Sequence, residues 1–273
     1  LGKYIQLEVV KEVDFGVYLD GDEDGEILLP QRYVPEGTTP GDMLNVFIYL
    51  DMDERLVATT LQPYVQVGEF ACLEVAWVNQ FGAFLNWGLM KDLFVPFREQ
   101  KAKMQKGGRY VVHAHLDEES YRIVASAKVE HYLSKEMPQY QKGDEVDVMV
   151  WQKTDLGYKV IVENAFSGML YRNEVFRQIA PGDHLQAYVK LVREDGKIDL
   201  ELQKEGAKKV DDFSERLLQF IKDNGGVTTI NDKSEADLIY DTFGVSKKTF
   251  KKAVGDLYKK RLVVLEEGRI RLA

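Results

Sequence analysis

Hydrophobic and polar residues alternate in short runs along most of the chain. Ile5, Leu7 and Val9 are separated by polar residues, and the same alternation recurs in the segment EVDVMV at 145–150. A period of two residues predicts β-strands with one buried face. Segments rich in Gly, Asp and Pro, such as DGDEDGE and PEGTTPGD, separate these runs and predict tight turns. The pattern therefore predicts many short strands joined by turns.

This strand pattern occurs three times at matching spacings. The copies begin at Gly2, Gly68 and Gly143, and in each copy the residue 13 positions later precedes a second glycine. Five short strands in one copy would leave open edges, so each copy is predicted to close into a small barrel of the OB type. We expect these barrels over residues 1–64, 65–139 and 140–205.

After residue 205 the period becomes that of helices. Apolar residues recur at helical spacing from Phe213 to Ile221, and the segment NGG at 224–226 is expected to end this helix. Ser234 and Ser246 are predicted to cap two further helices.

The chain then closes with two strand-like runs around a Glu-Gly turn. This order predicts a winged helix-turn-helix over residues 210–273. The predicted fold class is mainly β with a small α+β end: three tandem five-stranded OB-type barrels plus a C-terminal winged helix-turn-helix domain.

The segment WVNQFGAFLNWG at 77–88 places two phenylalanines around a glycine. Phe81 and Phe84 are three residues apart, so strict alternation would send them to opposite faces, whereas a bulge at Gly82 would let both point outward. Rings on a barrel surface stack on nucleic acid bases with little sequence preference, at roughly 1–3 kcal/mol per base. The alternative is that one ring of each pair fills the barrel interior.

These glycine-centred pairs resemble a motif of the S-one RNA-binding domain, an OB-fold unit. That family combines an aromatic-Gly-x-aromatic step on strand two, a Gly-x-x-His or aromatic step on strand three, and an Asp followed by a basic residue. The matching residues of copies one and two are Phe15, Tyr18, Leu28, Asp51 and Arg55, then Phe81, Phe84, Phe94, Asp117 and Arg122.

Copy three departs furthest from the motif, because Leu156 and Lys159 replace the two aromatic residues and Tyr171 takes the histidine place. The resemblance implies a base-binding face on each barrel. The predicted RNA-binding residues are Phe15, Tyr18, Arg55, Phe81, Phe84, Phe94, Arg122, Lys159 and Tyr171.

Charge is distributed unevenly along the chain, whose net charge is −9. Residues 1–64 alone carry 4 Lys+Arg against 13 Asp+Glu, whereas residues 65–139 carry 9 of each. Residues 246–261 hold seven Lys+Arg and one Asp, and they coincide with the third predicted helix. In a winged helix this element usually enters a nucleic acid groove. An exposed lysine face that only contacts solvent is the alternative.

The basic residues of this helix and of the following hairpin form a second predicted interface. The residues predicted to bind nucleic acid through the winged helix are Lys247, Lys248, Lys251, Lys252, Lys259, Arg269 and Arg271.

Three barrels followed by a winged helix resemble the conserved virulence factor B family of bacterial RNA-binding regulators. The stretches GMLYRNEVF and FGVSKKTFKKAVGDLYK are similar to that family. The resemblance implies binding of single-stranded RNA in the cytoplasm, control of gene expression, and no catalytic residues. The single cysteine, Cys72, excludes an internal disulfide and agrees with a reducing cytosol.

Other readings of the sequence are weaker or remain open. The segment DGDEDG at 20–25 resembles the start of a calcium loop, but Gln31 replaces its bidentate glutamate. His113 and His115 share a strand face without a third ligand, so we expect no metal. The sequence has no phosphate-binding glycine loop, nucleophile elbow or paired-carboxylate signature, so we expect no cofactor and no enzyme activity. No run is apolar enough to cross a membrane. Duplex DNA, or a protein partner on the ribosome or polymerase, is an alternative target, and the oligomeric state stays open.

Overall fold

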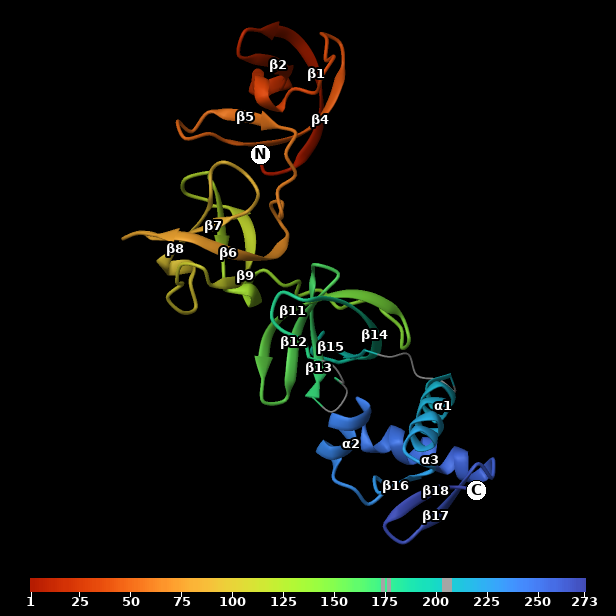
Figure 1. The fold of residues 1–273 in the computed structure, drawn as a ribbon. Helices are drawn as coiled ribbons and strands as arrows, with labels where there is room; N and C mark the ends of the chain where they lie inside the picture. The colour runs from red at the N-terminus through yellow and green to blue at the C-terminus, as the bar shows by residue number, and fades with distance from the viewer. Residues whose placement is uncertain (173–174, 176–177, 203–207) are drawn as a thin grey trace. The chain divides into compact units, whose positions relative to one another are not determined.

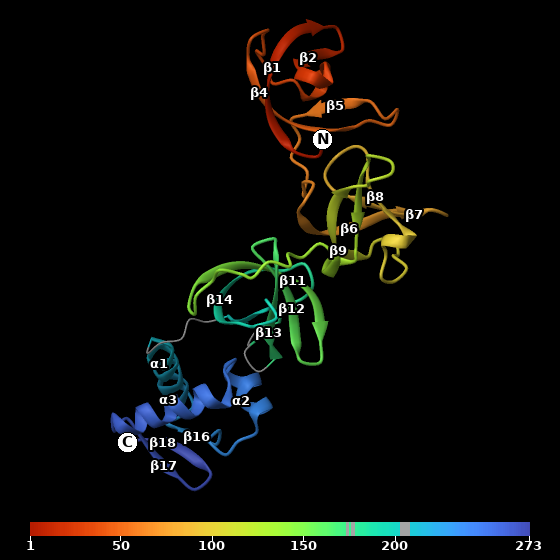
Figure 2. The ribbon, with the colours of Figure 1, turned by 180° about the vertical axis from the view of Figure 1, so that it is seen from behind.

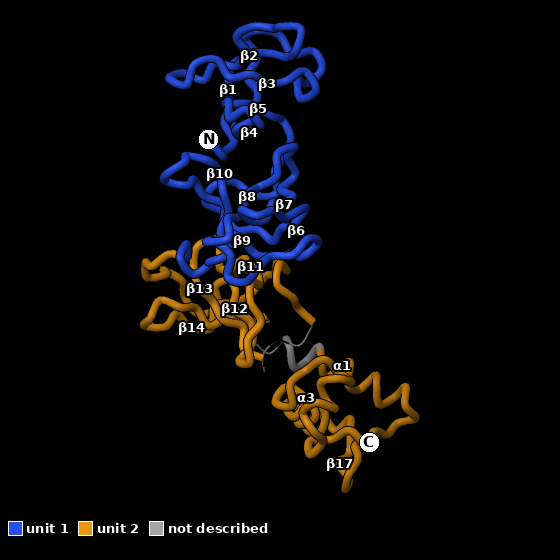
Figure 3. The backbone as a smooth tube through the Cα atoms, turned by 90° about the vertical axis from the view of Figure 1, so that its left-hand side faces the viewer, with its two compact units in different colours: residues 1–133 blue, residues 134–273 orange. Residues whose placement is uncertain are grey.

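The computed structural model describes residues 1–172, 175, 178–202 and 208–273, with the side chains of 208–212 excepted. The chain divides into two compact units, residues 1–133 and residues 134–273 (Figure 3). The first unit contains two closed barrels, and the second contains a closed barrel and a helical region with a small sheet (Figure 1). The predicted fold class is therefore confirmed. The expected boundary at 205–210 lies partly outside the described residues.

In each barrel the five strands lie in the same spatial order, first-second-third-fifth-fourth. Figure 2 shows the three barrels from behind. The strands of the first barrel are β1 (Tyr4–Val13), β2 (Gly16–Asp20), β3 (Glu26–Pro30), β4 (Met43–Leu50) and β5 (Leu56–Thr59). Those of the second are β6 (Phe70–Val78), β7 (Gly82–Asn86), β8 (Leu93–Pro96), β9 (Arg109–Leu116) and β10 (Ile123–Ser126). Those of the third are β11 (Glu145–Thr154), β12 (Gly157–Val162), β13 (Phe166–Tyr171), β14 (His184–Val192) and β15 (Ile198–Glu201).

The first strand of every barrel carries an irregularity at the same place. The pairing with the second strand shifts register after Val9, Val75 and Val150. A bulge bends its strand and re-aims the side chains that follow it. The residues that then face the second strand are Lys11, opposite Tyr18; Trp77, opposite Phe84; and Gln152, opposite Lys159.

The second strand begins with a glycine because the third strand passes very close to it. A Cβ at Gly82 would collide with the carbonyl oxygen of Val95, and a Cβ at Gly16 or Gly157 would meet the equivalent carbonyl of its own barrel. Gly157 also has φ +146°, a conformation that side-chain-bearing residues rarely adopt. The glycine between the two predicted stacking residues is thus required by close backbone packing.

The first barrel has a core of its own, and a second hydrophobic cluster joins it to the second barrel. Phe47, on β4, is fully buried, and its ring centroid lies 5.7 Å from that of Trp87 in the second barrel, with the rings at 81°. Tyr49 and Val57 of the first barrel belong to the same buried cluster as Leu85 of the second. Edge-to-face ring packing of this kind adds about 0.5–1.5 kcal/mol beyond the area it buries.

The helical region has the order predicted for a winged helix. Its elements are α1 (Lys208–Asp223), β16 (Val227–Thr228), α2 (Ala236–Phe243), α3 (Lys247–Lys259), β17 (Val263–Glu266) and β18 (Arg269–Leu272). The Ser246 side chain accepts a hydrogen bond from the Thr249 N–H and caps α3 as expected. The predicted Ser234 cap of α2 is wrong, because the Ser234 hydroxyl instead accepts from the Asn231 N–H. No helix among the described residues is long and apolar enough to span a membrane.

His113 and His115 lie on one face of β9, as predicted, but their environment is aromatic. The His113 ring lies 4.7 Å from the Phe70 ring and 4.2 Å from the Tyr132 ring, and only 8% of the residue is exposed. Burial, with a smaller contribution from His115, lowers the pKa of His113 from 6.5 to about 4. The imidazole is therefore neutral at pH 7 and behaves as part of the core.

This shift makes the stability of the protein depend on pH. Between pH 6.5 and pH 4, His113 is protonated in the unfolded state but stays neutral in the folded state. The stability that comes from burying the neutral imidazole is therefore fully present above pH 6.5 and is lost as the pH falls. From pH 7.5 to pH 5 we expect the native protein to lose about 2 kcal/mol more stability than His113→Phe, which cannot titrate. Urea unfolding followed by tryptophan fluorescence measures both. Parallel pH profiles would contradict the assignment.

Candidate nucleic-acid interface

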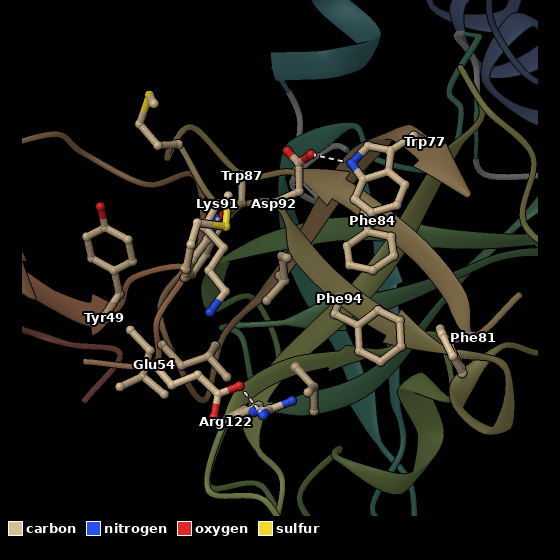
Figure 4. A pocket seen from close by; sticks show the side chains of 16 residues that line it. Tyr49, Glu54, Trp77, Phe81, Phe84, Trp87, Lys91, Asp92, Phe94 and Arg122 are labelled. Atoms are coloured by element: carbon tan, nitrogen blue, oxygen red, sulfur yellow. Dashed lines mark hydrogen bonds and ion pairs between the residues drawn. The ribbon is translucent and has the colours of Figure 1, made fainter. Parts of the chain in front are cut away.

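Three aromatic rings form a ladder across the second barrel (Figure 4). Trp77 and Phe84 are stacked with their ring centroids 3.7 Å apart and their planes within 3°. Phe84 and Phe94 follow at 4.8 Å and 34°. The ladder results from strand pairing, because β6 places Trp77 opposite Phe84 and β8 places Phe94 opposite the same residue.

Phe81 and Phe84 both point outward, but the predicted bulge at Gly82 is wrong. β7 begins at Gly82 and is regular, and the bulge lies in β6 instead. Phe81 precedes β7, in a turn where the Asn79 side-chain oxygen accepts hydrogen bonds from the N–H groups of Phe81 and Gly82. The turn leaves the Phe81 side chain 63% exposed.

A pocket of about 580 Å³ lies beside this ladder, between the two barrels of the first unit (Figure 4). The second barrel contributes all the aromatic residues except Tyr49, and the first barrel contributes the end of β4, with Tyr49, and the loop that follows it. The pocket has few polar side chains: those of Tyr49, Glu54, Lys91, Asp92 and Arg122. Ligand-binding pockets usually combine apolar walls with a few placed polar groups and have about 300–1,000 Å³.

The polar side chains of the pocket are organised by contacts with one another and with the backbone. The Trp77 Nε1 donates a hydrogen bond of 2.8 Å to the Asp92 carboxylate. The Lys91 Nζ donates to the backbone carbonyl of Asp51 in the first barrel at 2.7 Å. Burial lowers the pKa of Lys91, while nearby Glu54 opposes that shift. Arg122 forms an ion pair with Glu54, so each barrel supplies one partner.

The first barrel carries its predicted pair in a different arrangement. Phe15, 57% exposed, and Tyr18 meet edge-on, at 6.3 Å and 85°. The Lys11 Nζ lies 4.8 Å from the centre of the Tyr18 ring, at the register position that Trp77 occupies in the second barrel. Lys11 also pairs with Glu26.

The predicted cation of the first barrel is engaged locally. The Arg55 guanidinium donates two hydrogen bonds to one oxygen of Asp51 and also pairs with Asp53. Burial of Asp51 alone would raise its pKa, but these bonds and backbone N–H donors lower it. The equivalent turn of the second barrel is one residue longer and closes through an Asp117 N–H to Arg122 carbonyl bond. There Asp117 pairs with Arg98, which leaves the Arg122 guanidinium to Glu54.

At the place of the ring pair the third barrel has Leu156 and Lys159, and the predicted equivalence of Tyr171 is wrong. Strand pairing sets Met169, opposite Lys159, at the position of Phe94, whereas Tyr171 lies opposite Gly157. The Tyr171 hydroxyl donates to the Asp199 carboxylate at 3.1 Å. Of the resembling stretch GMLYRNEVF, residues 173, 174 and 176 lie outside the described residues.

The other predicted residues of this barrel remain candidates. Leu156 is 70% exposed, and the Lys159 Nζ lies 5.1 Å from the Trp151 ring. This surface therefore offers one exposed apolar side chain and a cation that already contacts a ring.

In the winged helix, the buried face of α3 consists of Phe250, Ala253, Val254 and Leu257. The predicted lysines lie away from this face, and the exposed ones are Lys248, Lys251, Lys252 and Lys259. Lys247 is half-buried and donates to the Lys233 carbonyl. Arg269 and Arg271 of the wing both contact the Glu266 carboxylate, and their hydrogen bonds lower its pKa.

Among the pocket residues that sequence reasoning missed, four make its polar contacts: Glu54, Trp77, Lys91 and Asp92. The two tryptophans that flank the Phe81–Phe84 pair were the only signal for Trp77. Glu54 and Lys91 gave no signal because each acts where the two barrels meet, and Asp92 gave none because its partner Trp77 is 15 residues away.

Two family models match separate parts of the chain. Residues 1–61 match the family model of the S1 domain, and residues 215–272 match that of the CvfB-like winged helix domain. Both are nucleic-acid-binding rather than enzymatic families. A solved structure of a multidomain protein with nucleic acid binding domains from Streptococcus pneumoniae TIGR4 is 26% identical, covers 100% of this chain and 98% of its own, and has a TM-score of 0.43.

Two curated relatives extend the similarity over most of the chain. The uncharacterized protein YitL of Bacillus subtilis is 29% identical over 277 residues, which cover 98% of this chain and 92% of that protein. Conserved virulence factor B of Staphylococcus aureus is 22% identical over 239 residues, which cover 85% of this chain and 80% of that protein. The chain therefore combines an S1 domain with a CvfB-like winged helix domain, and over most of its length it is similar to YitL and to conserved virulence factor B.

Proposed function

We propose that the protein binds single-stranded RNA in the bacterial cytosol and acts in the control of gene expression. The observation that carries the proposal is the ladder of Trp77, Phe84 and Phe94 beside a pocket with two cationic side chains. Exposed rings next to cations bind unpaired bases and backbone phosphates together. We further infer four functional modules, residues 1–64, 65–139, 140–205 and 210–273.

The basic surface of α3 supports a second set of contacts in the same function. Its exposed lysines are suited to phosphate oxygens rather than to bases, because an ammonium group is a point charge without a flat stacking surface. The same surface favours a second candidate function, binding of duplex DNA, because the third helix of a winged helix usually enters a groove.

Fluorescence anisotropy with labelled oligonucleotides tests the proposal. We expect pyrimidine-rich and mixed single-stranded RNA to bind at micromolar protein or below, with an affinity that falls as salt is raised. Tighter binding of a duplex of the same sequence would favour the second candidate. Failure of every single-stranded RNA to bind at low salt would contradict the proposed function.

The two aromatic pairs are expected to contribute unequally. The first barrel carries net −9 and repels phosphate, whereas the second is neutral. Changing Phe81 and Phe84 together to Ala removes the exposed Phe81 ring and the ring that supports Trp77. It should therefore weaken RNA binding more than changing Phe15 and Tyr18 together, with up to about 1–3 kcal/mol lost per stacked base. Anisotropy titrations measure both losses, and circular dichroism verifies the fold. Equal losses would remove the electrostatic argument.

Salt dependence separates stacking from charge. Each lost phosphate contact flattens the slope of log affinity against log salt by about 0.7 for a single strand. Changing Lys248, Lys252 and Lys259 to Gln should thus lower the slope by up to about two, whereas removing Phe81 and Phe84 should cost affinity at nearly constant slope.

The matched control for the lysine variant changes three exposed lysines outside α3. These control residues are Lys103, Lys106 and Lys135. An equal effect of both triple variants would mean that α3 attracts RNA only through net charge. An unchanged slope in the α3 variant would remove the helix from the RNA site.

A further inference from the structure

We propose that the pocket between the first two barrels is a binding site for one nucleobase of the RNA, with Trp77 as its stacking surface. The inference rests on the proposed function and specifies where on the first unit a base would bind. It differs from the sequence-based expectation, in which Phe81 and Phe84 form the base-binding pair on a single barrel.

Phe84 is poorly placed to stack on a base because both of its sides are occupied. Trp77 covers one side at 3.7 Å with nearly parallel planes, and Phe94 lies on the other side at 4.8 Å (Figure 4). Among the described residues, the only ring recorded against Trp77 is that of Phe84. Trp77 is 43% exposed and lines the pocket, so we infer that its face away from Phe84 is the stacking surface.

The indole is also held in one orientation. Its Nε1 donates to Asp92 at 2.8 Å, and Phe84 supports its inner face. A ring fixed in this way loses little conformational freedom when a base stacks on it. Satisfying the N–H within the protein leaves an apolar face for the ligand.

The composition of the pocket matches a nucleotide. The rings, together with Met52 and Met90, provide apolar surface for a planar base, and Lys91 and Arg122 provide positive charge for a phosphate. The side chains of Arg122 and Glu54 are 52% and 50% exposed, and such an ion pair contributes only about 0–1 kcal/mol. A phosphate that approaches Arg122 can therefore displace Glu54.

The first barrel completes the site. Met52 is 73% exposed, lies in the loop after β4 and lines the pocket. Tyr49 and Glu54, also from the first barrel, lie across the pocket from the ladder (Figure 4). A base that enters the pocket would thus contact both barrels, and neither barrel alone could form this site.

The test uses the full chain and single-stranded RNA 12-mers in which one base at a time is replaced by fluorescent 2-aminopurine. Stacking on an indole should quench the probe at one position of the bound RNA. We expect Trp77→Leu to remove that quenching and to weaken binding about tenfold, within the range for loss of one stacked base. Leucine keeps an apolar cover over Phe84, and Trp77→Phe should restore part of both signals.

Matched controls come from the same barrels. Phe97→Leu changes a ring of the second barrel that is 42% exposed and does not line the pocket, so it should leave quenching unchanged. Met52→Glu should weaken RNA binding severalfold by placing a carboxylate at the pocket, whereas Met43→Glu, on an exposed site of the first barrel away from the pocket, should not.

The outcomes separate this inference from the proposed function. RNA binding with equal effects of Trp77→Leu and Phe97→Leu would overturn the pocket site and leave the function standing. Equal effects of the two glutamate variants would exclude the first barrel from the site and overturn the composite pocket. No binding of any RNA by the unaltered protein would overturn both. Tight binding of an apolar peptide in place of RNA would assign the pocket to a protein partner.

Discussion

The packing of Phe47 against Trp87 is the contact on which the pocket of the first unit depends. It buries a large ring of one barrel in the core of the other, and so fixes two repeats that strand pairing alone would leave independent. The Trp87 Nε1 also donates to the carbonyl of Lys91. The same indole therefore joins the barrels and orients the loop that carries Lys91 and Asp92. From Asp92, one hydrogen bond reaches Trp77.

The repeats and their closure could be predicted because both follow from local rules. A period of two, glycines at fixed spacings and turn-forming segments define strands and their order, and the winged helix follows from helical spacing and the Ser246 cap. The glycine in each pair was correctly identified as important, but it is needed for a different reason than the predicted bulge. It admits the carbonyl of the neighbouring strand, and that approach is visible only once the barrel has closed.

The parts that sequence reasoning missed are those set by register and by contact between repeats. Tyr171 matches the motif in the sequence, but strand pairing shows that Met169 occupies the position equivalent to Phe94. Tyr171 lies two residues further along the strand. Trp77 faces Phe84 only because a bulge shifts β6 by one residue, which no alternation pattern encodes. Glu54 and Lys91 act across the boundary between barrels, so neither repeat predicts them by itself.

The bulge in each first strand has an evolutionary consequence. It presents one side chain, Lys11, Trp77 or Gln152, to the same place on the second strand of three related barrels, and none of these residues belongs to a barrel's buried core. A position outside the buried core can change by a single codon without disturbing the packing inside the barrel. After duplication, such a position lets copies of one module diverge in chemistry while their scaffold stays the same. The first barrel has a cation over a ring at this place, the second has two stacked rings, and the third has an amide.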